Sequence, residues 1–289
     1  MTPATLMPAA FIGHGSPMNT LEQNRFTSAW REFGKSVARP RAILVISAHW
    51  YIHGTALTAM PQPRTIHDFY GFPQPLFDFQ YPAAGAPDIA AEIAEVVQPS
   101  FVALDADSWG LDHGTWSVLA HVFPKADIPV LQLSVHAGED FSYHYELGKK
   151  LAQLRERGIL VLASGNVVHN LRRLDWNQPD KAYGWAEEFD AEVTRAMLGD
   201  PAALADLSRH PAYAMAVPTP EHYLPLAYIA GLSAASGEPS QVLVNGGSMG
   251  SLTMTSFVVG AGPIGHGRSD EAAASVPNPA VVPPEQTNI

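Results

Sequence analysis

Short apolar runs punctuate most of the chain and set its predicted architecture. The run at 42–47, AILVIS, is rich in β-branched residues and has no polar side chain before its end. Such a run predicts a strand that is buried on both faces, as in a parallel sheet covered by helices. Further strands are predicted at 8–13, 101–104, 128–135, 159–163, 241–245 and 253–259.

The segments between these runs carry apolar residues three or four positions apart, a spacing typical of helices. Phe26, Trp30 and Phe33, for example, form one apolar stripe. Helices are predicted at 19–37, 87–98, 114–123, 141–157, 181–198, 201–208 and 218–235. Alternation of strands and helices favours a parallel sheet. We therefore expect an α/β fold, a single domain with a mostly parallel central sheet covered by helices and its active site at the carboxyl ends of the strands.

Two stretches lack this periodicity. Residues 51–85 hold five prolines, and six aromatic residues lie between Phe69 and Tyr81. A long ordered loop in a compact domain is usually functional, so this one is expected either to wall a pocket for a flat apolar ligand or to cover an exposed edge of the core. Residues 261–289, with five prolines and little periodicity, are expected to form a disordered tail after a folded domain at 1–260.

Composition narrows the class of protein. The net charge of -11, from 17 basic and 28 acidic residues, argues against nucleic acid or an anionic membrane as a partner. No apolar run approaches the roughly 20 residues of a membrane span, and the first ten residues lack a signal-peptide pattern. We therefore expect a cytoplasmic protein. The absence of cysteine means that any metal site must use nitrogen and oxygen ligands.

Five histidines follow predicted buried strands or lie where predicted helices begin. They are His14, His49, His113, His169 and His222, each close to glycine or proline apart from His49. A lone histidine at a strand end usually bonds a backbone carbonyl. Parallel strands, however, deliver their carboxyl ends to one edge, and several imidazoles gathered there favour a metal site. His67, in the long loop, is a weaker candidate.

Five motifs in order resemble those of the class III extradiol ring-cleavage dioxygenases, the LigB-like family. They are GHGSPMN at 13–19, SAHW at 47–50, GLDHGTW at 110–116, SGNVVHN at 164–170 and PTPEHYLPL at 218–226. The most similar branch is that of the DOPA 4,5-dioxygenases of bacteria and plants. The resemblance runs from about residue 11 to residue 260, and it implies an enzyme that opens a catechol ring with O2 at one non-haem metal. Fe(II) is expected for turnover, with zinc possible as the bound metal.

The resemblance also implies a ligand set. His14 and His49 match the metal-binding histidines of the family. The third ligand matches the PTPEH motif, where one branch uses glutamate and the DOPA branch uses histidine, so this chain offers both Glu221 and His222. Successive residues at a helix start point about 100° apart, so one of the two is expected to face the metal, and His222 is preferred. His169 matches a position that is an acid/base in one branch and a possible further ligand in the other.

The remaining roles concern the substrate. His169 is the expected acid/base, because imidazole titrates near neutral pH and catechol cleavage needs protons removed and delivered. His113 is expected to donate a hydrogen bond to a substrate oxygen or to dioxygen. DOPA is the lead substrate, and Arg172 and Arg173 are either partners for its carboxylate or ordinary solvated residues.

Two other functions use the same residues. A zinc hydrolase or amidase would use Glu221 as general base on a zinc-bound water. A non-catalytic member of the superfamily would bind protein partners through the retained cleft, although the presence of all five histidines disfavours it. The physiological catechol and the oligomeric state are left open.

Overall fold

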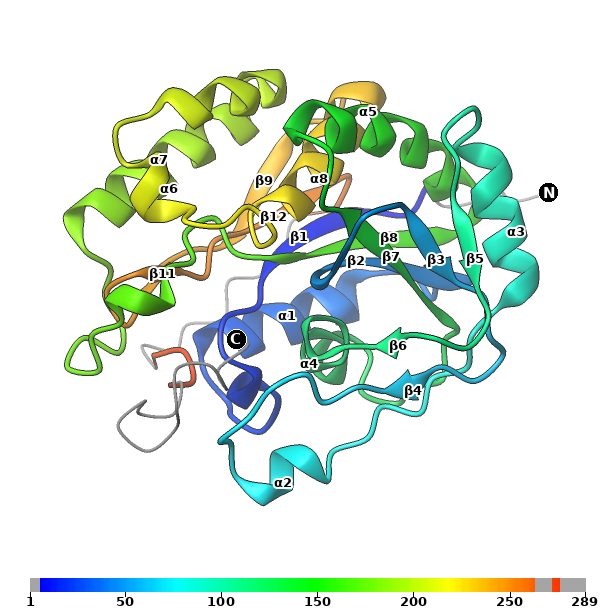
Figure 1. Ribbon diagram of the computed structural model, residues 1–289, viewed down its shortest axis with the longest axis horizontal. Coiled ribbons are helices and arrows are strands. Elements are labelled where there is room, and N and C mark those ends of the chain that lie inside the picture. The colour runs from blue at the N-terminus through cyan, green and yellow to red at the C-terminus, as the bar shows by residue number, and fades with distance from the viewer. Residues whose placement is uncertain (1–5, 263–271, 276–289) are drawn as a thin grey trace.

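A computed structural model describes residues 6–262 and 272–275. Among these residues an eight-stranded sheet forms the centre of the molecule (Figure 1). In spatial order its strands are β5 (Ala103–Asp105), β3 (Ala56–Thr58), β7 (Val130–His136), β2 (Ala42–Ile52), β8 (Ile159–Gly165), β1 (Ala9–Gly13), β12 (Ser256–Val259) and β9 (Ser240–Val244).

The central strands β7, β2, β8 and β1 are mutually parallel. The sheet departs from this direction at its two sides, since β3 is antiparallel to β7 and β12 is antiparallel to β1. Two small ribbons stand apart from the sheet, namely β4 (Arg64–Thr65) with β6 (Gly110–Leu111), and β10 (Gly247–Ser248) with β11 (Leu252–Thr253). The mostly parallel α/β fold predicted from the apolar runs is confirmed.

Alternate residues of the central strands enter two separate hydrophobic cores. Phe11 and Leu44 belong to one core, whereas Ile12 and Ile43 belong to the other. Side chains of a strand alternate between the faces of a sheet, and helices cover both faces here. The unbroken apolar runs in the sequence follow from burial on both sides.

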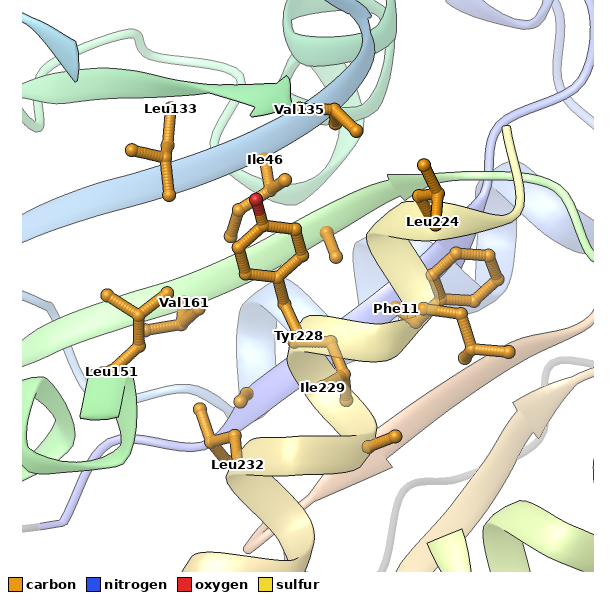
Figure 2. Packing of buried hydrophobic residues seen from close by; sticks show 14 of the residues in the cluster. Phe11, Ile46, Leu133, Val135, Leu151, Val161, Leu224, Tyr228, Ile229 and Leu232 are labelled. Carbon is orange, nitrogen blue, oxygen red and sulfur yellow. The ribbon is translucent and has the colours of Figure 1, made fainter. Parts of the chain in front are cut away.

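Different sets of helices cover the two faces of the sheet (Figure 1). The first core is closed by α3 (Pro87–Val96), α5 (Phe141–Leu151), α6 (Gly184–Leu198) and α8 (Leu224–Ser236), and the second by α1 (Arg25–Ser36) and α4 (His113–Val122). Helix α8 is buried nearly all round, and its Tyr228, Ile229 and Leu232 lie against the central strands (Figure 2). The shorter helices are α2 (Gln74–Phe77) and α7 (Tyr213–Ala216), with 3₁₀ helices at Pro17–Thr20, Ala152–Arg157, Leu171–Arg173 and Pro201–Arg209.

Several predicted boundaries were wrong for local reasons. The helix expected at 19–37 begins at Arg25, because Asn24 and Thr27 form a capping box. The helix expected from 218 begins at Leu224, after a turn that carries His222. The long loop contains β3, which joins the main sheet and whose three-residue length gave little periodicity to detect.

Most of the predicted tail, 261–289, lies outside the described residues. The described part at 272–275 packs against the loop after β1, where the Ala274 amide donates to Asn19 Oδ1 at 3.0 Å and Ser16 Oγ donates to the Ser275 carbonyl at 3.1 Å. In the part of the chain that the structure describes, no helix is both long and apolar enough to cross a membrane.

Candidate metal centre

The five histidines come from five separate segments and meet at one edge of the sheet. His14 follows β1, His49 lies near the end of β2, His113 begins α4, His169 follows β8, and His222 precedes α8. The ring centroid of His14 is 5.1 Å from that of His49 and 5.4 Å from that of His222, and the last two are 5.0 Å apart. The predicted convergence at the carboxyl ends of the parallel strands therefore occurs.

The strand β2 carries an irregularity where His49 lies. Its parallel pairing with β7 is regular up to Ile46 and resumes at Tyr51 with a shifted register. An irregularity of this kind changes the direction in which a side chain points. The register shift in β2 thus lies at the residue, His49, whose side chain lies beside His14.

Hydrogen bonds fix the tautomer of His14. Its Nδ1 lies 2.9 Å from Ser164 Oγ, and that hydroxyl donates its only proton to the Gly114 carbonyl at 2.6 Å. Ser164 must therefore accept from His14, so the proton is on Nδ1 and Nε2 presents a lone pair. Burial, followed by repulsion from His49, lowers the pKa of His14 well below its ordinary value, which keeps the ring in the neutral form that binds metals.

His49 is oriented in the same way by a carboxylate. Its Nδ1 lies 3.2 Å from Asp68 Oδ2, and its Nε2 lies 3.2 Å from the Nε2 of His14. With both Nδ1 atoms protonated toward their acceptors, two lone pairs face each other. In these neutral tautomers the contact is unfavourable, and either a metal ion or one proton shared by the two nitrogens would relieve it.

The donor geometry fits a metal ion. Two imidazole nitrogens each about 2.1 Å from one ion, at tetrahedral to octahedral angles, are about 3.0–3.4 Å apart, and the observed 3.2 Å falls in this range. His14, His49 and His113 offer ligand atoms that all lie within 4.8 Å of one another, as do His169, Glu221 and His222. The two groups adjoin through the His14, His49 and His222 rings.

Glu221 and His222 differ in their surroundings. His222 is buried, and its Nε2 has no hydrogen-bond partner among the described residues. Its Nδ1 lies 3.2 Å from Glu221 Oε1, which also accepts a bond from Thr219 Oγ1 at 2.7 Å. Burial, followed by repulsion from His169, lowers the pKa of His222 well below its ordinary value. The nitrogen without a partner is thus Nε2 of His222, and the Glu221 carboxylate lies at the opposite nitrogen, Nδ1, of the same ring.

His169 lies flat against His222. Their rings stack with centroids 3.5 Å apart and planes 7° from parallel. The His169 amide donates to the Ala216 carbonyl at 2.9 Å, which ties the segment after β8 to the segment that leads to His222. His169 therefore borders the cluster without standing between His14 and His49.

Two glycines allow the segments to approach this closely. A Cβ on Gly114 would come within 2.4 Å of Ser47 Oγ and 2.8 Å of the His49 ring. A Cβ on Gly165 would come within 2.2 Å of the His222 carbonyl. These contacts explain physically why glycine stands in the DHG and SGN motifs.

Asp68 is a member of the site that the sequence did not single out. Its two carboxylate oxygens face His49 Nδ1 at 3.2 Å and His113 Nδ1 at 2.9 Å, and it also accepts from the His113 amide at 3.0 Å. Burial alone would raise the pKa of Asp68, but its interactions with the adjacent imidazoles of His113 and His49 outweigh it and lower that pKa. The only signal in the sequence was its position in the long loop, beside the weaker candidate His67.

Asp112, a fully buried carboxylate, supports the start of α4. Asp112 caps this helix by accepting from the Thr115 amide at 3.2 Å, and it accepts from Ser47 Oγ at 2.7 Å. Burial, aided by the nearby charge of Asp68, raises the pKa of Asp112 to about 6. The cap places His113 with its ring centroid 3.8 Å from that of His49.

The aromatic residues of the long loop at 51–85 pack mainly into the second core, and few of them contact the histidine cluster. Phe69, Phe72 and Tyr81 are buried in that core. Phe69 also reaches the cluster, with its ring edge-on to His113 at 5.5 Å between centroids. His67 Nε2 lies 2.9 Å from the Phe79 carbonyl, so the structure keeps it outside both groups of possible ligands.

Comparison with known proteins connects this geometry to a family. The model of the catalytic LigB subunit of aromatic ring-opening dioxygenase matches residues 8–255. A protein of Escherichia coli (strain K12) named 4,5-DOPA dioxygenase extradiol is 48% identical over 263 residues, which cover 89% of this chain and 96% of that protein. A protein of Beta vulgaris with the same name is 37% identical and covers 80% of this chain and 87% of its own length.

A solved structure agrees with the fold. The crystal structure of an uncharacterized protein from Escherichia coli K12 matches with a TM-score of 0.77 and 42% identity, over 88% of this chain and all of that one. The family match spans most of the chain and includes all five of the clustered histidines. This chain belongs to the family of the catalytic LigB subunit of aromatic ring-opening dioxygenases.

Proposed function

We propose that this enzyme cleaves the ring of a catechol beside its two hydroxyl groups, using O2 and one Fe(II) ion held by His14, His49 and His222. The observation that supports the ligand assignment is the convergence of three imidazoles whose Nδ1 atoms each face an oxygen. The Nε2 atoms of His14 and His49 lie 3.2 Å apart, and that of His222 is buried without a partner among the described residues. Three protein ligands leave positions free on a six-coordinate ion. Fe(II) bound there would supply the affinity for both catechol oxygens and the redox chemistry toward dioxygen.

His169 is proposed as the acid/base. It borders the cluster, stacked on His222, where a catechol bound at the three ligands would present a hydroxyl. Imidazole is suited to accept the proton that this hydroxyl loses and to return a proton during ring opening. A further ligand at this position would crowd the site, so the acid/base role is preferred to ligation.

His113 is proposed to donate a hydrogen bond to a substrate oxygen or to dioxygen. It is fully buried, and its Nε2 has no partner among the described residues. Asp68 lies 2.9 Å from the opposite nitrogen, Nδ1, and would stabilise the cationic ring, the form in which Nε2 is also a donor. A buried donor without a partner is expected to meet one when substrate binds.

DOPA is the proposed substrate. A cytoplasmic location of the protein remains a prediction. Support for DOPA comes from the names of the relatives in Escherichia coli and Beta vulgaris. The product would be a yellow semialdehyde that can cyclise. The ring would lie near Phe69, an aromatic side chain that contacts His113.

The test is oxygen uptake after anaerobic reconstitution of the metal-free protein. The Fe(II) form is expected to consume O2 when L-DOPA is added, and the matched zinc form is expected to consume none. Uptake by neither form with L-DOPA or any other catechol tested, with metal content verified, would overturn the dioxygenase proposal. Uptake by the Fe(II) form with other catechols but without L-DOPA would overturn only the choice of substrate.

A further inference from the structure

We infer that residues 273–275 form a strap that holds the loop of His14 in place and slows the release of the metal. The inference rests on the proposed role of His14 as a ligand, and it is independent of which catechol is cleaved. The strap lies beyond residue 255, where the match to the family ends, so the family resemblance does not account for it. In Figure 1 the strap lies in the short red segment, beside the blue loop after β1.

The strap is packed into the protein. Ala273 and Ala274 are buried, and Ala273 belongs to the second hydrophobic core. The two loop residues that the strap contacts, Ser16 and Asn19, are buried as well. Ser16 Oγ donates to the Ser275 carbonyl at 3.1 Å. The strap and the loop must therefore separate before water can reach the bonds between them.

Asn19 connects the strap to His14. Its Oδ1 accepts from the Ala274 amide at 3.0 Å, and its Nδ2 donates to the His14 carbonyl at 3.0 Å. A backbone amide can only donate and a carbonyl can only accept, so these two partners settle the orientation of the Asn19 side chain. Two consecutive hydrogen bonds thus join the strap to the backbone of the proposed ligand.

Asn19 also joins the loop to both helices of the second core. Its Oδ1 accepts from Nδ2 of Asn24, the residue that caps α1, at 2.8 Å, and its carbonyl accepts from Nε2 of His121, on α4, at 2.7 Å. Both lone pairs of Oδ1 are in use when the strap is in place. Loss of the strap would leave one of them buried without its donor, which destabilises this arrangement of the loop.

The consequence for the metal follows from the position of His14. Its ring is fixed by Ser164 at Nδ1, and its backbone is fixed by Asn19. A ligand must withdraw from an ion before the ion can leave, and a loop that is held in place opposes this movement. Residues that support a ligand typically contribute 10- to 100-fold to metal affinity. Because the strap acts through Asn19, we expect a contribution at the lower end of this range.

The test measures the rate at which Fe(II) passes to a chromogenic chelator from the full chain under anaerobic conditions. Ala274→Pro removes the amide proton that is donated to Asn19 and is expected to release Fe(II) about 10-fold faster than wild type, the effect of one hydrogen bond. Ala272→Pro is the matched control, because the amide of Ala272, directly before the strap, makes no hydrogen bond to a described residue. Its rate should equal that of wild type.

Hydrogen exchange, followed by mass spectrometry, separates this role from general stability. In Ala274→Pro the amides of residues 14–20 should exchange faster, whereas the protection of β2 and β8 should not change. Ala274→Glu, which places a charge at the same buried position, is the second variant and should behave in the same way.

Release of Fe(II) at the wild-type rate from both Ala274 variants would overturn the inference. Equal acceleration by Ala272→Pro would do so too, as would acceleration that accompanies loss of protection in β2 and β8. Failure of wild type to retain Fe(II) would instead refute the proposed metal site. Retention of Fe(II) without catechol cleavage would refute only the proposed reaction.

Discussion

His14 and His49 face each other through their Nε2 atoms at 3.2 Å, although they are 35 residues apart in the chain. Each ring is held from behind, by Ser164 in one case and by Asp68 in the other. In the neutral tautomers that those bonds favour, the two Nε2 lone pairs face each other. A metal ion between the two nitrogens would relieve that repulsion.

The first prediction separates the two candidates for the third ligand. His222→Ala should lose the metal, because it removes the unpartnered Nε2. Glu221→Gln should keep it, weakened at most by the 10- to 100-fold typical of a supporting residue. Metal content after dialysis, measured by elemental analysis, checks both, with the exposed His53→Ala as control. Loss of metal from Glu221→Gln but not from His222→Ala would reverse the assignment.

The second prediction concerns His169. His169→Ala should retain Fe(II) and lose kcat by about 10²- to 10⁴-fold, as expected for removal of a general acid/base. Single-turnover kinetics on protein of verified metal content measure this loss. Full activity would remove the acid/base role, and loss of the metal would make His169 a ligand instead.

The third prediction tests Asp68 as the support of His49 and His113. Asp68→Asn should weaken Fe(II) affinity by about 10- to 100-fold, because Asn offers one acceptor where two imidazoles need one each. Asp78→Asn is the matched control, since Asp78 lies on the same loop but is exposed. Competition with a chelator measures the affinity, and equal values for the two variants would contradict the role.

The fourth prediction concerns stability and pH. Asp190, on α6, is half-buried as a residue, but its carboxylate accepts a bond from Thr255 Oγ1 at 2.7 Å and leaves Oδ1 buried without a partner among the described residues. Burial raises the pKa of Asp190 to about 6 from an ordinary 3.8. A carboxyl whose pKa is higher in the folded state favours folding while protonated, so its contribution is complete below pH 3.8 and is lost as the pH rises through 6.

Asp190→Asn should remove that dependence. Relative to the variant, wild type should lose up to about 3 kcal/mol of unfolding free energy between pH 4 and pH 7, at about 1.36 kcal/mol per pKa unit. Urea unfolding of both proteins across this range gives the difference. A difference that stays constant with pH would show that Asp190 is already ionised at pH 4 in the folded protein.

The sequence could predict the fold and the histidines because both depend on local patterns. Buried parallel strands read as continuous apolar runs, and such strands deliver their carboxyl ends to one edge. Hence His14 and His49 were found from their positions after β1 and within β2. His222 required the family resemblance in addition, because no pattern marks the turn before α8.

What the sequence could not predict depends on contacts between distant segments. Asp68 lies in a loop without periodicity, and only the packing of that loop on α4 brings it to His113. The position of the proton on His14 likewise depends on Ser164, which is 150 residues away. Neither relationship has a signature within its own segment.

The most direct test of the central claim is the stoichiometry and product of one reaction. The Fe(II) enzyme is supplied with L-DOPA in a closed cell, O2 consumption is followed, and the product is identified by mass spectrometry. Consumption of one O2 per L-DOPA, with a yellow product that carries both oxygen atoms or the same mass less water after cyclisation, is the predicted result. L-DOPA and every other catechol recovered unchanged from enzyme of verified Fe(II) content, with no O2 consumed, would contradict the account.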